Sequence, residues 1–367
     1  MDSASRVGTS TNLPIIDISP WLEPSSTDNA GRRKDVSAAL HSACLTHGFF
    51  YLNISSFVTP DETDELTRLA REFFSLPEEE KLKLSLSNQD GARGYARLKE
   101  NVTNGLADNH EGLDFYKPVQ MPDRTKPVWG ENQWPTVSGF QAKYQIWIEK
   151  MKTLGMIVME AMSVGLGMSH DEWEELKNQV DDSFWVMRVI GYPPLPNDEN
   201  GFSCGAHKDY GCLTFLYADP TPNALQVFIP NSKLPISPED VIPPEAKTAG
   251  GVWINADPIP GCFVCNIGEM WEVWTNGLYS ATLHQVVHRG SNHRVSIPFF
   301  FEPNFDALVK PLAAALRLQD CAGNLTNGAK DHSEETTHAT KYKPAVYGDF
   351  LVGKVGGNFA TSKGKYD

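Results

Sequence analysis

Two histidines and one aspartate in this chain have the residue types and the spacing of a metal site. His207 and Asp209 are two positions apart, and His284 follows in a distant segment. On a β-strand, side chains two positions apart point to the same side, so the first pair can converge on one ion. The nearby segment 213–217 is apolar and rich in strand-forming residues, which favours a strand here. Two imidazoles and one carboxylate hold one face of a divalent metal and leave the other positions open, as suits non-haem Fe(II) enzymes that activate O2.

By itself a His-x-Asp pair also fits an ordinary surface or core contact, and a second pair of residues strengthens the metal interpretation. Arg294 and Ser296 follow His284 in the chain and are again two positions apart. The planar guanidinium fork of an arginine matches a carboxylate, and a nearby hydroxyl adds a hydrogen bond. Together these two residues can anchor the far carboxylate of a keto acid whose other end chelates the iron.

With these motifs, the sequence resembles the Fe(II)/2-oxoglutarate-dependent oxygenases. The matching branch includes isopenicillin N synthase, the plant flavonoid oxygenases and the ethylene-forming enzymes. The resemblance covers roughly residues 13–351 and is most specific between 184 and 303. The family's blocks occur here in the family's order as His207–Gly211, Leu225–Val227, Trp253–Ile254, Pro258–Gly261, Asn266–Glu269, Trp274–Gly277, His284, and Arg294 with Ser296.

The resemblance implies a fold, a set of cofactors and the residues that hold them. The fold is mainly β with surrounding helices, built on a double-stranded β-helix (jelly-roll) core. The cofactor is Fe(II), with 2-oxoglutarate and O2 as cosubstrates and ascorbate as the reductant. The implied iron ligands, which are also the catalytic residues, are His207, Asp209 and His284, and Arg294 and Ser296 bind 2-oxoglutarate.

Other polar residues near these motifs leave alternatives open. His288 and His293 compete for the role of third ligand, but the family's spacing to the arginine favours His284. His110 could mimic a ligand, although the iron set is complete without it. Arg188 lies in an apolar strand, where it either contacts the keto acid, as the resemblance implies, or forms a structural ion pair. Tyr192 could also reach the cosubstrate or the substrate.

The substrate-binding residues are less well defined. The polar loop with Asn101, Val102 and Thr103 matches a family segment over the mouth of the active site. The arginine-oxidising ethylene-forming type has a glutamate at the position of Asn101 and an arginine near its C-terminus. This chain has no arginine after residue 317. Further candidates to line the pocket, with core packing as the alternative for each, are Tyr210, Phe299 and Phe301, together with Phe300 and Trp271.

These features favour hydroxylation or desaturation of a small natural product with a flavanone-like scaffold, in the manner of a flavone synthase. The alternatives are oxidation of a guanidino amino acid such as arginine or homoarginine, or ethylene-forming chemistry. A non-catalytic binding module on the same fold is a further alternative, against which the complete set of iron ligands argues.

The composition limits the partners. A chain of 367 residues with 41% hydrophobic and 10% aromatic residues is ordinary for one large or two smaller globular domains. The net charge of −14 disfavours nucleic acid and anionic membranes as partners. Neither a signal peptide nor a transmembrane run is evident, and six cysteines form no disulfide framework, so we expect a cytoplasmic protein. The oligomeric state stays open.

The periodicity of apolar residues predicts the elements that must position these groups. We expect three regions: an N-terminal region of helices and strands over 13–180, the jelly-roll core over 181–303, and a C-terminal helical lid over 304–367. A strand at 184–194 should begin the catalytic sheet, and the long helix should back it. The expected helices are 31–47, 60–74 and 139–167, and the expected N-terminal strands are 13–18 and 49–54.

Overall fold

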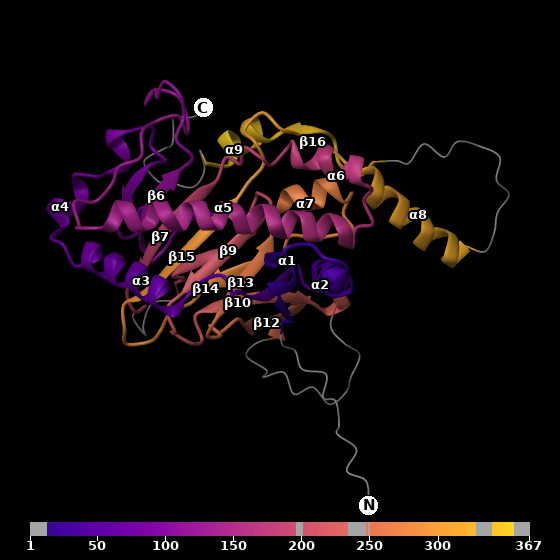
Figure 1. Cartoon of the computed structure of the whole chain (residues 1–367). Coiled ribbons are helices and arrows are strands. Elements are labelled where there is room, and N and C mark those ends of the chain that lie inside the picture. The colour runs from indigo at the N-terminus through magenta and orange to yellow at the C-terminus, as the bar shows by residue number, and fades with distance from the viewer. Residues whose placement is uncertain (1–12, 196–200, 234–246, 249, 328–339, 356–367) are drawn as a thin grey trace, which may run out of the picture.

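The computed structural model describes residues 13–195, 201–233, 247–248, 250–327 and 340–355. Two facing β-sheets form its centre (Figure 1). The larger sheet has eight strands, antiparallel except for its first pair. In spatial order these strands are β1 (Ile15–Asp17), β2 (Phe49–Asn53), β13 (Cys262–Ile267), β9 (Leu213–Ala218), β15 (Arg294–Phe301), β7 (Val186–Tyr192), β6 (Glu111–Tyr116) and β3 (Gly94–Ala96).

The smaller sheet has five antiparallel strands and carries two of the expected ligands. Apolar side chains from both sheets pack in one cluster between them, for example Val227 and Val286 against Tyr51 and Val264. This is the packing of a double-stranded β-helix, so the predicted fold is confirmed. In spatial order the strands are β11 (Lys247–Thr248), β12 (Gly251–Asn255), β10 (Leu225–Pro230), β14 (His284–Val286) and β8 (Cys204–His207).

Helices cover the outer face of the larger sheet. The longest, α5 (Phe140–Gly165), crosses it with α2 (Thr27–Thr46) and α3 (Pro60–Phe74) alongside, as Figure 1 shows. The predicted helices and N-terminal strands are confirmed, but α2 begins before residue 31. Ser26 accepts a hydrogen bond from the backbone N–H of Asn29 and caps the helix there.

Further elements complete the fold. Among the helices, α7 follows β13 directly and α9 lies near the C-terminal end of the described chain. The remaining helices are α1 (Ser19–Leu22), α4 (Glu78–Leu82), α6 (His170–Lys177), α7 (Glu269–Trp274), α8 (Ala313–Asn327) and α9 (Tyr347–Val355). The short strands are β4 (Val102–Thr103), β5 (Leu106–Ala107), β16 (Leu308–Val309) and β17 (Ala345–Val346).

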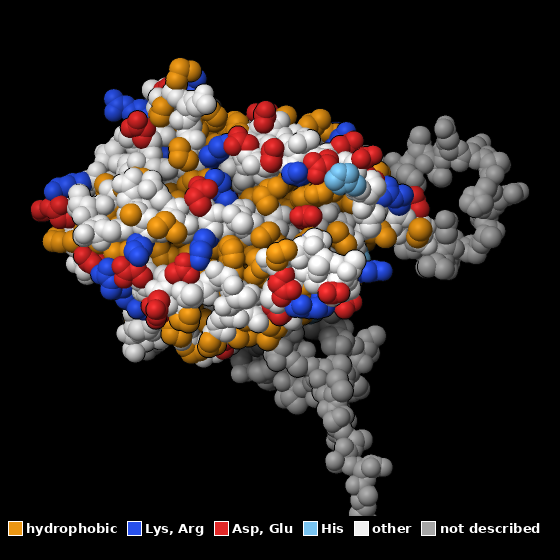
Figure 2. All heavy atoms as spheres, in the orientation of Figure 1, with side chains coloured by type: hydrophobic (Ala, Val, Ile, Leu, Met, Phe, Trp, Pro, Cys, Tyr) orange, Lys and Arg blue, Asp and Glu red, His pale blue; other side chains and the backbone are white. Residues whose placement is uncertain are grey.

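The N-terminal region is more closely joined to the core than expected. Four of the eight strands of the larger sheet, β1, β2, β3 and β6, come from residues before 181. The three-region division of the chain stays a prediction. The sequence also predicts a polar loop over 322–341, but α8 continues to Asn327, and residues 328–339 lie outside the described part of the chain. Acidic and basic side chains are interspersed over the visible face of the molecule (Figure 2). In the part of the chain that is described, no helix combines the length and apolar character needed to span a membrane.

Candidate active site

Three expected ligands meet at one end of the smaller sheet. His207 ends β8 and His284 begins β14, and the two are direct partners across these antiparallel strands. Asp209 follows in the turn that leads to β9. The Nε2 atom of each histidine lies 3.6 Å from Asp209 Oδ1, and the ring centroids are 4.3 Å apart. The structure therefore brings together the two imidazoles and the carboxylate that the sequence singled out.

Hydrogen bonds on the far side of each group aim it at the common point. Nδ1 of His207 lies 2.8 Å from the Gly205 carbonyl oxygen, and Nδ1 of His284 lies 3.0 Å from that of Thr282. Because a carbonyl oxygen only accepts, each Nδ1 carries a proton, and Nε2 is the ring nitrogen that faces the common point. On the carboxylate, the Oδ2 atom of Asp209 accepts from Thr214 and Asn266, which leaves Oδ1 facing the rings.

The charges of this cluster are those of a cation site. Burial raises the pKa of Asp209, but the two imidazoles and the hydrogen bonds lower it overall, so the carboxylate is ionised. Burial and the charge of His207 lower the pKa of His284 to about 4. Burial also lowers the pKa of His207, but the neighbouring Cys204 and Asp209 raise it overall to about 10. A metal ion at His207 must therefore displace a proton.

The expected 2-oxoglutarate residues lie on the larger sheet. Arg294 on β15 is paired with Tyr192 on β7, and its guanidinium carbon lies 4.9 Å above the tyrosine ring. The arginine is 2% exposed, and its Nε and Nη1 atoms have no hydrogen-bond partner among the described residues. Ser296 is buried beside them and hydrogen-bonds the phenol of Tyr192. A buried guanidinium without a partner is unfavourable, so this site fits a ligand carboxylate.

Arg294 also borders a cavity of about 310 Å³ that opens to solvent at one end. Apolar side chains from both sheets line it, among them Leu216, Leu225 and Val264. A chain of two methylene groups between two carboxylates fits this combination of an apolar wall and a buried cation.

A second cavity, of about 550 Å³, opens beside the metal ligands, and we call it the substrate pocket. His207 and Asp209 form part of its wall. Of the expected substrate residues, Asn101, Val102, Thr103 and Tyr210 line the pocket, and so does Arg188. Residues of α9 close one side of it, namely Leu351, Lys354 and Val355.

Arg188 forms the structural ion pair that the sequence left as one alternative. Its Nε lies 2.8 Å from Asp114 Oδ1, and its Nη2 donates to Asn101 Oδ1 at 2.9 Å. The two competing histidines lie apart from the metal cluster. His288 Nε2 lies 2.7 Å from the Asn292 carbonyl oxygen, and His293 Nε2 is 3.7 Å from a carboxylate oxygen of Glu111.

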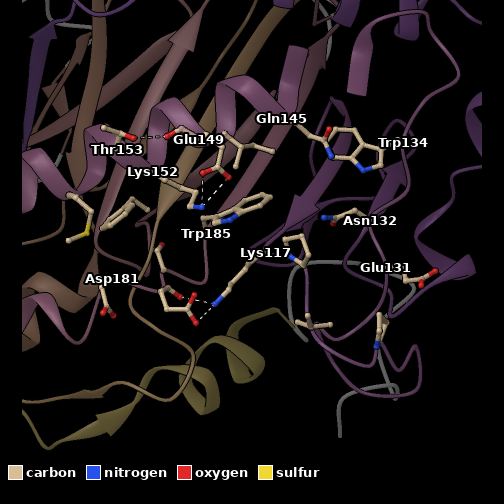
Figure 3. Close-up of a pocket in the computed structure, with 18 of the residues that line it drawn as sticks. Lys117, Glu131, Asn132, Trp134, Gln145, Glu149, Lys152, Thr153, Asp181 and Trp185 are labelled. Carbon is tan, nitrogen blue, oxygen red and sulfur yellow. Dashed lines mark hydrogen bonds and ion pairs between the residues drawn. The ribbon is translucent and has the colours of Figure 1, made fainter. Parts of the chain in front are cut away.

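Three of the predicted pocket residues, Phe299, Phe301 and Trp271, do not line the substrate pocket, and Trp271 is fully buried in the core. Phe299 stacks on Trp185 with ring centroids 5.9 Å apart, and Phe301 packs so closely on α5 that a Cβ at Gly155 would lie 2.2 Å from its ring. Phe301 lines a separate cavity of about 810 Å³, in which Trp185 also lies (Figure 3). Strand alternation explains the error, because Phe300 shares the inward face with Arg294 and lines the substrate pocket.

Several charged residues of the pocket escaped the sequence analysis. Asp108 and Glu302 are buried in its wall, and burial raises the pKa of both carboxyls, that of Glu302 to about 8. Lys354 Nζ pairs with Glu269 Oε1 at 2.7 Å and lies 5.7 Å above the ring of Tyr210. The sequence gives little indication that these residues line a pocket. Lys354 lies beyond the blocks that match the family, and isolated acidic residues are usually found on a solvated surface.

Two segments of this chain match models of known protein families. Residues 182–303 match the family model described as the 2OG-Fe(II) oxygenase superfamily. Residues 13–137 match the one described as the N-terminal region of the non-haem dioxygenase in morphine synthesis. A homoarginine-6-hydroxylase of soybean (Glycine max) is 37% identical over 95% of this chain and 98% of its own length. One of Arabidopsis thaliana is also 37% identical, over the same shares.

Solved structures agree in fold. A full-length protein of Neurospora crassa, in complex with alpha-KG and 5-formyluracil, superposes with a TM-score of 0.70 at 24% identity, covering 94% of this chain and 95% of that one. The rice dioxygenase for auxin oxidation gives a TM-score of 0.64 at 20% identity, covering 95% and 97%. The family models and the relatives, together with the His-Asp-His cluster, lead to one conclusion: the chain belongs to the Fe(II)/2-oxoglutarate-dependent oxygenases and uses Fe(II), 2-oxoglutarate and O2.

Proposed function

We propose that this oxygenase hydroxylates a guanidino amino acid, with homoarginine as the first candidate. The observation that carries the proposal is the 37% identity, along nearly the whole chain, to proteins named homoarginine-6-hydroxylases. The flavanone-like substrate favoured by the sequence has no comparable support. A pocket wall that includes Asp108, Arg188, Glu302 and Lys354 also suits a charged molecule better than an apolar one.

In this proposal each group of the site has one task. His207, Asp209 and His284 hold Fe(II), and Arg294 and Ser296 bind the far carboxylate of 2-oxoglutarate. Bound together, iron and keto acid activate O2 for oxidation of a substrate C–H bond, with release of succinate and CO2. The protein positions the substrate carbon and keeps water from the interior.

The position of the oxidised carbon sets the direction of the substrate. In homoarginine, carbon 6 carries the guanidino nitrogen, so the guanidinium lies near the metal and the α-amino and α-carboxylate groups lie near the pocket mouth. Two buried carboxyls are close to the ligands: Asp108 accepts from the N–H of Gly205, and the nearby charge of Asp209 adds to the burial that raises the pKa of Glu302. At the solvent edge, Lys354 offers a cation for the α-carboxylate.

Asn101 has a different task from the glutamate that the ethylene-forming type carries at this position. Its Oδ1 atom accepts from Arg188, so it cannot neutralise a guanidinium. We therefore assign recognition of the guanidinium to Asp108 and Glu302. A cationic substrate supplies the counter-charge that both carboxyls lack among the described residues, where neither forms an ion pair with Lys or Arg.

The test is succinate formation by the full chain with Fe(II), ascorbate and 2-oxoglutarate, measured separately with homoarginine, arginine and naringenin. We expect homoarginine to stimulate succinate release. Because the oxidised carbon carries nitrogen, the hydroxylated product is a hemiaminal, so mass spectrometry should detect it with one added oxygen atom together with the guanidine and aldehyde to which it collapses. Stimulation by naringenin alone would restore the flavanone hypothesis. A variant with Asp209→Ala serves as the control for release that does not depend on the iron site.

Ethylene-forming chemistry is a second candidate, and the same assay addresses it when 1-aminocyclopropane-1-carboxylate is added as a further substrate. A 1-aminocyclopropane-1-carboxylate oxidase of Dictyostelium mucoroides is 28% identical over 94% of this chain. Gas chromatography of the headspace distinguishes the two reactions, because hydroxylation releases no ethylene. Ethylene in amounts comparable to succinate would favour this candidate over hydroxylation.

A further inference from the structure

A second group of metal-binding side chains lies in the wall of the substrate pocket, next to the iron ligands. A carboxylate oxygen of Asp108, a ring nitrogen of His110 and the Sγ atom of Cys204 all lie within 4.8 Å of one another. We propose that these three residues bind a second divalent ion, of the thiol-seeking kind represented by Zn²⁺. The site rests on these three side chains alone, and only its effect on turnover depends on the proposed function.

His110 has the arrangement of a metal-binding histidine. Its Nδ1 lies 2.7 Å from the Ser203 carbonyl oxygen, so Nδ1 carries the proton and Nε2 has the lone pair. The iron-site histidines His207 and His284 are fixed by backbone carbonyls in the same way. His110 is only 1% exposed, yet its Nε2 has no hydrogen-bond partner among the described residues.

The other two ligands are held in place by hydrogen bonds and still have lone pairs that can bind a metal. Oδ1 of Asp108 accepts from the Gly205 N–H at 2.8 Å and Oδ2 accepts from the Thr103 hydroxyl at 2.7 Å. Each oxygen keeps a further lone pair. The Sγ atom of Cys204 is 3.8 Å from His207 Nδ1, a weak contact because that nitrogen already donates to the Gly205 carbonyl.

The spacing and the donor set fit zinc. Ligand atoms at about 2.0 to 2.3 Å from one tetrahedral Zn²⁺ lie roughly 3.3 to 3.8 Å apart, so the three side chains must close in by about 1 Å or more where they are farthest apart. The three residues would leave a fourth position for water. The donors here are nitrogen, oxygen and sulfur, whereas the iron site has two nitrogens and one oxygen. A thiolate ligand favours zinc or cobalt over ferrous iron, so we expect the two sites to prefer different metals.

Occupancy of this site has a consequence for the enzyme. Asp108, Cys204 and His110 line the same pocket as Asn101 and Thr103. A dication held there would take up the carboxylate that we assign to the substrate cation. We therefore expect Zn²⁺ to inhibit substrate-stimulated turnover even when the iron site keeps Fe(II).

The experiment is a titration of the metal-free full chain with Co²⁺, followed by absorption spectroscopy in the absence of substrate and 2-oxoglutarate. Cobalt bound by a thiolate gives an intense charge-transfer band in the near ultraviolet, whereas cobalt on two histidines and a carboxylate gives only weak visible bands. We expect two Co²⁺ ions per chain and a thiolate band that belongs to one of them. One ion per chain without a thiolate band would overturn the proposal.

Variants identify the ligands. Cys204→Ser should remove the band and weaken the second ion at least about tenfold, whereas Cys262→Ser, at another half-buried cysteine, should keep the band. His284→Ala should remove the weak visible bands and keep the thiolate band. Retention of the thiolate band in Cys204→Ser would refute the site. If Cys204→Ser also lost cobalt at the iron site, as a misfolded variant would, His110→Gln decides, because it should lower the affinity of the band-forming ion alone.

Discussion

At the residue scale, hydrogen bonds to the atoms that face away from the metal position orient the iron ligands. The Gly205 and Thr282 carbonyls fix the rings of His207 and His284, and Thr214 and Asn266 fix the carboxylate. None of these four groups touches the metal position. They point the three donor atoms at one place before any ion arrives, which reduces the reorganisation that metal binding requires.

The first prediction tests this orientation. Asn266→Ala removes one hydrogen bond from Oδ2 of Asp209 and frees the carboxylate to rotate. We expect the affinity for Fe(II), or for Co²⁺ as its substitute, to fall by about 10- to 100-fold, as is usual when such a partner of a metal ligand is lost. Isothermal titration under nitrogen measures it. Asn255→Ala, at an exposed asparagine of β12, is the matched control, and equal affinities for the two variants would contradict the orienting role.

The second prediction concerns the unpaired guanidinium. Arg294→Met removes the charge and keeps an apolar side chain of similar length, so the KM for 2-oxoglutarate should rise by about 10- to 150-fold, the value of one lost charged hydrogen bond of about 1.5–3 kcal/mol. Because the charge is buried and its Nε and Nη1 atoms have no hydrogen-bond partner among the described residues, the ligand-free variant should be at least as stable as the original protein. A lower melting temperature without ligand, together with an unchanged KM, would show that Arg294 pairs within the protein instead.

At this scale, the predictions from the sequence relied on the two-residue alternation of side chains along a strand and on the resemblance to the oxygenase family. The ligand triad and the Arg294–Ser296 pair came from spacing together with the resemblance, and the structure brings the triad atoms together. Phe299 and Phe301 were misplaced because the alternation of β15 was not counted from Arg294. Thr214 and Asn266 could not be assigned, since their contact with Asp209 depends on how two distant strands pair.

At the element scale, α9 closes one side of the substrate pocket. Its buried residues Tyr347, Leu351 and Val355 fix the helix to the body, and Lys354 reaches from it across to Glu269 at the start of α7. A C-terminal helix is therefore present where the sequence predicted one, and its role as a lid stays a prediction. The helix supplies the cation that the proposed substrate orientation needs at the pocket mouth.

The third prediction follows from this placement. Lys354→Met should raise the KM for homoarginine by about 10-fold, since a partly exposed charged hydrogen bond is worth about 1.5 kcal/mol, and should affect the KM for 2-oxoglutarate much less. Steady-state succinate release measures both. Lys177→Met, at another partly exposed lysine that pairs with a glutamate, is the control. If the KM for homoarginine does not move, the substrate lies in the other direction or is a different molecule.

The fourth prediction concerns the ion pair between α8 and α6. Arg317 and the backbone N–H of Ser169 lower the pKa of Glu172 to about 2 from its ordinary 4.5. A lowered pKa in the folded state stabilises the fold above pH 4.5, and this contribution disappears as the pH falls towards 2. The side chain of Arg317 is 54% exposed and that of Glu172 21%, so water screens the pair, and we expect Arg317→Gln to lower the free energy of unfolding by only about 0.3–0.5 kcal/mol at pH 7.

Urea unfolding at several pH values measures the effect of Arg317→Gln. The difference between the variant and the original chain should shrink steadily below pH 4.5, as Glu172 becomes protonated. Arg32→Gln removes a similarly exposed pair, with Glu23, and its difference provides the control for loss of a surface arginine. A difference for Arg317→Gln that stays constant down to the lowest accessible pH would show that the ion pair is not the cause.

At the scale of the whole molecule, the site joins the two sheets. His207 and His284 belong to the five-stranded sheet, while Thr214, Asn266 and Arg294 belong to the eight-stranded one. Asp209 lies where the chain crosses between them. The jelly-roll core was predictable because its blocks are local in sequence, but the four N-terminal strands of the larger sheet were not placed, because long-range strand pairing has no local signal.

The last prediction uses this bridging position. A ligand that binds only the folded state stabilises it by about 2.7 kcal/mol when its concentration is 100 times its Kd. Ions at the triad and 2-oxoglutarate between the sheets should therefore raise the melting temperature of the whole chain in a single cooperative transition. One end of 2-oxoglutarate is expected to chelate the metal, and the other to bind Arg294. We therefore expect 2-oxoglutarate to stabilise the folded protein strongly only when Mn²⁺ or Co²⁺ is present.

Thermal unfolding of the chelator-treated chain, with each ligand alone and with both, measures this coupling. His284→Ala should lose most of the joint stabilisation, and Arg294→Met should keep the metal's share and lose that of the keto acid. Additive shifts from the two ligands, with no dependence of one on the other, would place 2-oxoglutarate away from the metal. Since its carboxylate would then lie at Arg294 without chelation, that outcome would contradict the arrangement in which one cosubstrate spans the interior from one sheet to the other.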